Sequence, residues 1–116
     1  MPQENEDFLH EINSVDEIEG FLKKHQFCLL YVSRPECTVC HAILPKLLIM
    51  LESYPQIYVG HINASRVEQV AERFLVFSVP TIMIFIDGKE YLRTDRFVRL
   101  EQLSEQVNSM YNFLFS

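Results

Sequence analysis

Two cysteines, Cys37 and Cys40, stand between two apolar segments of the chain. Residues 27–32 before the pair are apolar at every position, and residues 42–51 after it form a longer, mostly apolar stretch. This order predicts a strand, a short turn, and a helix whose first turn carries both thiols. Side chains three residues apart share one helix face, so the two sulfur atoms can come close enough to form a disulfide. The pair therefore constrains this region to a strand–turn–helix unit.

The first thiol of the pair is placed for redox chemistry. The positive end of the helix dipole favours the thiolate of Cys37 over the thiol. A C-x-x-C pair beside a βαβ pattern is typical of a redox site when the chain has few other cysteines. This chain has 3 cysteines. They are too few for a closed disulfide framework, and the reducing cytosol suits such a chain. We therefore expect a cytoplasmic protein with one dithiol–disulfide pair.

Length and charge exclude several classes of protein. A chain of 116 residues is long enough for one core and too short for two, so we expect a single domain over residues 1–116. The net charge is −6 without a basic block, which argues against nucleic acid as a partner. No apolar stretch reaches the roughly 18 residues of a membrane span, and residues 1–7 lack the pattern of a secretory signal. A monomer without membrane contact is the expectation.

Helical and strand patterns alternate along the chain. Strands are expected at residues 8–12, 27–32, 57–62, 82–86 and 89–98. Helices are expected after the capping box that starts at Ser14, over residues 37–53, around residues 67–74 and from Leu100 onward. The pair Asp87-Gly88 is a strong hairpin signal between the last two strands. The order βαβαβαββα predicts an α/β domain with a mixed central β-sheet and helices on both faces.

Four motifs then occur in one order and at set spacings. Cys37-Thr38-Val39-Cys40 lies at the strand-to-helix turn, and Pro45 follows five residues after the second cysteine. Val79-Pro80-Thr81 precedes a strand, and Asp87-Gly88 lies in the closing hairpin. Together they resemble the thioredoxin family, and the resemblance extends from about Phe8 to the final helix. It implies the thioredoxin fold.

The resemblance also implies roles for individual residues. Cys37 is expected to be the exposed attacking thiol and Cys40 the buried resolving thiol. Pro80 is expected to be a cis-proline that faces the cysteines, with the backbone of Val79 binding an extended substrate segment. Pro45 is expected to kink the active-site helix.

The implied activity is thiol–disulfide exchange. The thiolate of Cys37 attacks a substrate disulfide, a mixed disulfide forms, and Cys40 attacks Cys37 to release the reduced substrate. The expected substrates are protein disulfides. The pair itself is the redox centre, so no cofactor or metal is expected. The electron donor, a thioredoxin reductase or a low-molecular-weight thiol, is not identified by any residue pattern.

Several positions depart from the family pattern around the cysteines. Glu36 stands where thioredoxins have a tryptophan, and Thr38-Val39 replaces Gly-Pro. Arg34 should lower the pKa of Cys37 and the adjacent Glu36 should raise it. These two effects oppose each other, so the helix dipole should decide, and we expect a net lowering.

Three further positions also depart from the family pattern. Tyr31 replaces the family's buried acid, and His61 aligns with its lysine partner. Either the two hold or pass a proton as a pair, or they are packed residues with satisfied polar tips. Arg96 aligns with a small glycine that flanks the substrate groove, so we expect a narrowed or positively charged groove. Thr81 is expected to bind substrate with Val79 and Pro80.

The cysteines and histidines also allow other interpretations. Residues 37–41 spell C-x-x-C-H, the haem-attachment pattern, but the fold resemblance already explains the two cysteines, and His41 is more simply an exposed residue. Zinc needs four ligands, and no second cysteine pair is present. Cys28 falls within a buried strand, where a free cysteine behaves as a small hydrophobic residue.

Two functions from different classes remain open. The first is a thiol–disulfide oxidoreductase that reduces protein disulfides through Cys37 and Cys40, and the retention of both cysteines supports it. The second is a thioredoxin-fold binding or adaptor module with little turnover. The missing tryptophan, Gly-Pro and buried acid support the second.

Overall fold

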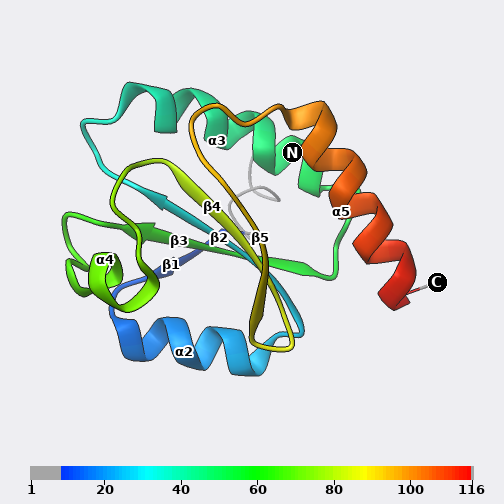
Figure 1. The fold of residues 1–116 in the computed structure, drawn as a ribbon, viewed down its shortest axis with the longest axis horizontal. Helices are drawn as coiled ribbons and strands as arrows, with labels where there is room; N and C mark the ends of the chain where they lie inside the picture. Colours follow the sequence, from blue (N-terminus) through cyan, green and yellow to red (C-terminus); the bar gives the residue numbers. More distant parts are fainter. Residues whose placement is uncertain (1–8, 116) are drawn as a thin grey trace.

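The computed structural model describes residues 9–115, and its centre is a five-stranded sheet with strand order β1-β3-β2-β4-β5 (Figure 1). The strands are β1 (Leu9–Ile12), β2 (Phe27–Ser33), β3 (Ile57–Asn63), β4 (Thr81–Ile86) and β5 (Lys89–Thr94). The helices are α2 (Val15–Lys24), α3 (Thr38–Leu51), α4 (Gln69–Phe74) and α5 (Leu100–Phe115). Strands β1, β3 and β2 run parallel to one another. Strand β4 pairs antiparallel with β2, and β5 pairs antiparallel with β4. The mixed sheet and its element order confirm the prediction.

The central strand β2 divides the core into two layers. Alternate side chains of a strand point to opposite faces, and every residue of β2 is buried because both faces are covered. Leu29 and Tyr31 pack among residues of α3 and α5, whereas Cys28 and Leu30 pack among residues of α2 and α4. Figure 1 shows the same division, with α3 and α5 over one face of the sheet and α2 and α4 over the other.

The start of α2 and the turn between β4 and β5 lie where the sequence predicts them. The hydroxyl oxygen of Ser14 accepts a hydrogen bond from the backbone N–H of Glu17 at 3.1 Å, which caps α2. Asp87 and Gly88 both have positive φ angles, 53° and 78°, and link β4 to β5 in a tight turn. Both predicted signals are confirmed. Phe8, the first residue of the predicted strand 8–12, lies outside the described residues.

The predicted bounds of β5 and of α3 differ from the structure. Strand β5 ends at Thr94 rather than at Val98, because Asp95 folds the chain into a turn. The carboxylate of Asp95 accepts from the N–H of Phe97 at 2.9 Å, and its carbonyl accepts from the N–H of Val98 at 3.0 Å. Helix α3 spans residues 38–51 instead of 37–53, so Cys37 precedes the helix as its N-cap.

Helix α3 contains Pro45 in its interior, as expected from the sequence. A proline inside a helix lacks the N–H that would bond to the carbonyl four residues earlier. The kink expected there stays a prediction. Within residues 9–115, no helix is both long and apolar enough to cross a membrane.

Candidate active site

Cys37 and Cys40 form a disulfide at the N-terminus of α3, with their Cα atoms 5.3 Å apart. Cys37 is the N-cap residue, and its sulfur accepts a hydrogen bond from the backbone N–H of Cys40 at 3.1 Å. Cys37 is half-buried, whereas Cys40 is 1% exposed. The two sulfurs are thus unequal. Only the first lies where a partner molecule can reach it, and the second is shielded behind it.

Two hydrogen bonds hold the turn that precedes the cysteines. The guanidinium of Arg34 donates to the hydroxyl of Ser65 at 3.1 Å, which joins the turn to the loop after β3. The Nε2–H of His41 donates to the carbonyl of Pro35 at 2.7 Å, which joins the turn to the first turn of α3. His41 is exposed, as expected, but it also braces the segment that presents Cys37. The exposed Glu36 lies in this segment.

Tyr31 lies beneath the active-site helix. Its hydroxyl donates to the backbone carbonyl of Cys40 at 2.6 Å, and its side chain is fully buried. Burial raises the pKa of Tyr31 to about 12, because the charged form loses its hydration. Tyr31 therefore stays protonated near neutral pH and supports the helix as a hydrogen-bond donor.

His61 lies beside Tyr31 in the register of β2 and β3, but its polar atoms bind other residues. The Nδ1–H donates to the carboxylate of Glu11 at 2.7 Å, and Nε2 lies 2.6 Å from the hydroxyl of Ser33. With a neutral imidazole, Ser33 is the donor in the second contact. The Tyr31 and His61 rings are 6.2 Å apart at their centroids. The predicted neighbours are adjacent, yet each polar tip has its own partners.

Neither Glu11 nor Ser33 was among the expected site residues. Ser33 is 6% exposed, and the His61 side chain is 18% exposed. A carboxylate, an imidazole and a hydroxyl therefore form a short hydrogen-bonded chain on the sheet face that α3 covers. These hydrogen bonds require β1 to pair with β3, because that pairing places Glu11 opposite His61. The local sequence carries no signal for the pairing.

The loop before β4 carries Val79 and Pro80, two of the residues expected to bind substrate. The Val79–Pro80 peptide bond is cis, as the family resemblance implied. Val79, Pro80 and Arg96 line one surface hollow, together with Ser78, Asp95 and Phe97. The structure thus brings together three of the residues expected to bind substrate.

Arg96 has a neighbour that no sequence pattern singled out. Its guanidinium lies 4.9 Å from the centroid of the Phe97 ring, and Phe97 is 75% exposed. The rim of the hollow therefore carries a cation stacked on an aromatic side chain.

Thr81, the fourth residue expected to bind substrate, points inward instead. It is 6% exposed, and its hydroxyl donates to the carbonyl of Ser78 at 2.7 Å. Its contact closes the loop around Pro80 from within. Thr81 therefore supports the loop from within and does not face solvent.

Cys28 lies in β2, away from the disulfide, and burial raises the pKa of its thiol to about 12. Its sulfur lies 3.2 Å from the carbonyl of His25, to which the thiol donates.

We expect the reduced native protein to alkylate fastest at Cys37, more slowly at Cys40 and hardly at all at Cys28 at a pH of about 7 to 8, because thiolates are the reactive form. Timed labelling with iodoacetamide and peptide mass spectrometry will show the order. Equal rates at Cys37 and Cys40 would contradict it.

No metal-binding cluster accompanies these residues: residues 9–115 contain no group of three or more His, Cys, Asp or Glu side chains that could hold a metal ion.

Known proteins share this arrangement of sequence and fold. The family model described as Thioredoxin matches residues 9–109. The chain belongs to the thioredoxin family. Thioredoxin-like protein YdfQ of Bacillus subtilis (strain 168) is 52% identical over 100 residues, which cover 86% of this chain and 89% of YdfQ.

Known structures of thioredoxins show the same fold. A mutant thioredoxin from Halobacterium salinarum NRC-1 superimposes with a TM-score of 0.79 at 17% identity, covering 89% of this chain and 90% of that one. Mitochondrial thioredoxin 3 from Saccharomyces cerevisiae, in its oxidized form, gives a TM-score of 0.79 at 14% identity, covering 90% and 98%. The predicted thioredoxin fold is confirmed.

This member of the thioredoxin family is a thiol–disulfide oxidoreductase, which acts with disulfide substrates and a reductant.

Proposed function

We propose that this thioredoxin-family protein reduces protein disulfides through a Cys37/Cys40 dithiol–disulfide cycle. The observation that carries the proposal is the inequality of the two sulfurs. Cys37 is accessible at the N-cap of α3, where the helix dipole favours its thiolate, and Cys40 is buried directly behind it. An accessible nucleophile with a shielded resolving thiol is the arrangement that two-step exchange needs.

The proposed cycle conserves electrons and protons. The thiolate of Cys37 attacks one sulfur of the substrate disulfide, and the other substrate sulfur leaves as a thiolate that takes up a proton. Cys40 then loses its proton and attacks the sulfur of Cys37. The second substrate thiol leaves, and the Cys37–Cys40 disulfide holds the oxidised state. A reductant, either a thioredoxin reductase or a low-molecular-weight thiol, returns two electrons and two protons.

The hollow at the cis-proline supports a role for nearby residues in substrate binding. The backbone of Val79 is proposed to hydrogen-bond an extended substrate segment, while Pro80 and Arg96 contact it from either side. Such contacts bind any polypeptide backbone, so they suit protein disulfides better than small molecules.

The proton of Cys40 needs an acceptor, and we assign that role to His61. Tyr31 does not qualify, because burial raises its pKa to about 12 and its hydroxyl already donates to the carbonyl of Cys40. An imidazole nitrogen can accept a proton, and the carboxylate of Glu11, 2.7 Å from Nδ1, would pair with the ring once it does. Arg34, Glu36 and Pro45 are proposed to modulate the thiols without touching the substrate.

We also propose that the protein works in the cytoplasm as a monomer and needs no bound cofactor. A reduced Cys28 and a single redox pair are compatible with the cytosol.

An equilibrium redox titration of the Cys37–Cys40 pair tests the proposed function. Alkylation and intact mass at each glutathione or dithiothreitol ratio will give the oxidised fraction. We expect one two-electron transition near the thioredoxin value of about −270 mV. A transition between about −180 and −120 mV would indicate an oxidant or isomerase instead. A pair that forms no reversible disulfide would exclude redox turnover and favour the binding-module alternative.

A further inference from the structure

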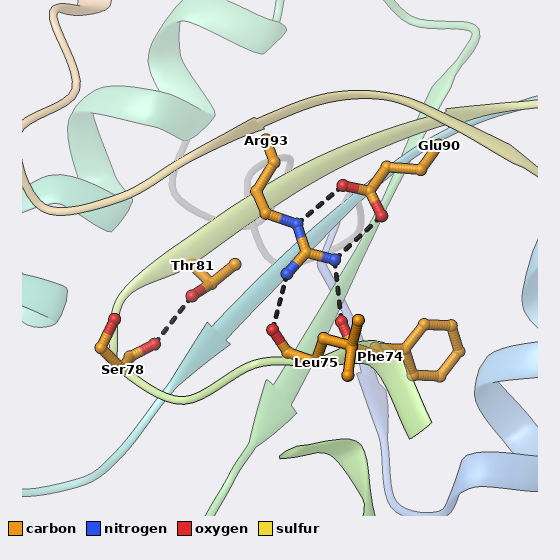
Figure 2. Close-up of polar contacts among 6 residues, drawn as sticks. All are labelled: Phe74, Leu75, Ser78, Thr81, Glu90 and Arg93. Atoms are coloured by element: carbon orange, nitrogen blue, oxygen red, sulfur yellow. Dashed lines mark hydrogen bonds and ion pairs between the residues drawn. The ribbon is translucent and has the colours of Figure 1, made fainter. Parts of the chain in front are cut away.

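The loop that connects α4 to β4 carries Val79 and Pro80, and polar contacts hold it at both ends (Figure 2). At its start, Leu75 adopts a left-handed conformation with φ 56° and ψ 48° and forms the C-cap of α4. At its end, the hydroxyl of Thr81 donates to the carbonyl of Ser78 at 2.7 Å. The segment between these anchors is the one proposed to contact substrate.

Arg93 of β5 provides the anchor at the start of the loop. Its Nη1 donates to the carbonyl of Leu75 at 2.8 Å, and its Nη2 donates to the carbonyl of Phe74 at 2.8 Å. Carbonyls in the last turn of a helix lack partners within the helix, so a side chain that reaches them stabilises the helix end. Figure 2 shows the guanidinium lying between these two carbonyls and the carboxylate of Glu90.

Glu90 fixes the orientation of this guanidinium. Its two carboxylate oxygens accept from Nε at 2.7 Å and from Nη2 at 2.9 Å. The hydrogen bond to Glu90 is also the largest cause that raises the pKa of Arg93. A planar guanidinium held on one edge by a carboxylate presents its remaining N–H groups in a fixed direction. That direction is toward the α4 end of the loop.

We propose that Arg93 is a positioning residue for the substrate loop, oriented by Glu90 and assisted at the far end by Thr81. The inference rests on the proposed function, because it assigns a role within substrate binding by the Val79–Pro80 loop. Arg93 contacts neither the disulfide nor the substrate. It acts by holding the backbone that carries Val79, so its effect depends on how much of the substrate lies along that backbone.

The dependence on substrate size separates positioning from general structural support. A protein disulfide such as that of insulin offers an extended segment to the loop, whereas bis(2-hydroxyethyl) disulfide offers no backbone at all. Misplacement of the loop should therefore weaken the reaction with insulin and leave the small disulfide unaffected. A damaged fold or an altered thiol would slow both reactions.

The matched control is Arg73, another arginine in a double hydrogen bond with a glutamate. Its Nε and Nη2 donate to Glu19 at 2.9 and 2.6 Å, which joins α4 to α2. Its described hydrogen bonds go to this carboxylate and not to the backbone of the loop before β4. Its guanidinium also lies 5.0 Å from the centroid of the Phe74 ring. Arg73→Gln thus removes a comparable ion pair without removing a hydrogen bond to the loop backbone.

The experiment compares wild type, Arg93→Gln, Arg93→Lys and Arg73→Gln with dithiothreitol as the reductant. For Arg93→Gln we expect kcat/KM with insulin to fall roughly tenfold, mainly through KM, because two carbonyl contacts to a charged donor are lost. Arg93→Lys should give a smaller loss, because an ammonium keeps the charge but not the fork. All variants should reduce the small disulfide at the wild-type rate, and Arg73→Gln should match wild type with both substrates.

Equal losses of Arg93→Gln with both substrates, or no loss with insulin, would overturn the inference while leaving the proposed function intact. A wild-type protein that reduces neither substrate would instead overturn the proposed function and the inference with it. If Arg93→Gln does not fold, Thr81→Val tests the other anchor while keeping the side-chain shape. We expect slower insulin reduction and an unchanged small-disulfide rate, and an unchanged insulin rate would overturn the inference.

Discussion

Replacing Cys37 with serine is expected to lower the reduction of disulfide substrates by roughly 10³-fold or more, because a serine hydroxyl is not ionised near neutral pH and cannot attack a disulfide. Replacing Cys40 with serine is expected to stop the cycle one step later. Cys37 then still attacks, and the mixed disulfide accumulates because its resolving thiol is missing. Thiol release from insulin measures the first loss, and intact mass of the trapped adduct measures the second.

Cys28→Ser is the matched control for both substitutions. Its thiol is buried in β2 with a pKa raised to about 12, so its removal should leave turnover unchanged. A Cys37→Ser variant that turns over substrate would contradict the assignment of the nucleophile. A Cys37→Ser variant that keeps full affinity for a partner, in a protein whose wild type shows no turnover, would support the binding module instead.

The fold was predictable because its strongest signals are local. A run of apolar residues in β2 predicts a strand covered on both faces, and the structure buries all of it. A serine three residues before a glutamate predicts a helix start, and Asp87-Gly88 predicts a hairpin. Each signal depends only on neighbouring residues, so one sequence suffices to interpret it. The end of β5 was mispredicted because the Asp95 turn competes with an otherwise acceptable strand pattern.

The supporting residues of the site were not predictable in the same way. Arg93 reaches the carbonyls of Phe74 and Leu75 from a strand 19 and 18 positions away. Glu11 meets His61 only because β1 pairs with β3, 50 positions further along the chain. Such contacts follow from strand register and side-chain direction. The cysteines and Pro80 were found because motif spacing marks them, whereas an arginine that binds two carbonyls has no spacing to recognise.

The partners of Tyr31 and His61 bear on two interpretations that sequence alone left open. Tyr31 donates to the carbonyl of Cys40 at 2.6 Å and His61 bridges Glu11 and Ser33, so the two residues do not form a hydrogen-bonded pair. Both lie on the sheet face covered by α3, the helix that contains Cys40. Of the two, the imidazole is the group with a ring nitrogen that can accept a proton.

His61→Gln is therefore expected to slow the resolution of the mixed disulfide by roughly 10²-fold, the lower end of the usual contribution of a general base. Glutamine keeps a polar side chain of similar size beside Ser33, so the fold should persist, but it cannot take up the proton of Cys40. The rate of the first attack by Cys37 should stay close to wild type, because that thiol is ionised before it reacts. Stopped-flow mixing of the reduced protein with a chromogenic disulfide separates the two steps.

Tyr31→Phe is the matched comparison. It removes the hydrogen bond to the carbonyl of Cys40, and it should cost about 1 kcal/mol of stability with little change in the resolution rate. If Tyr31→Phe slows resolution as strongly as His61→Gln does, the two variants act through the shape of the pocket under α3. The proton of Cys40 would then leave by a route that does not include His61.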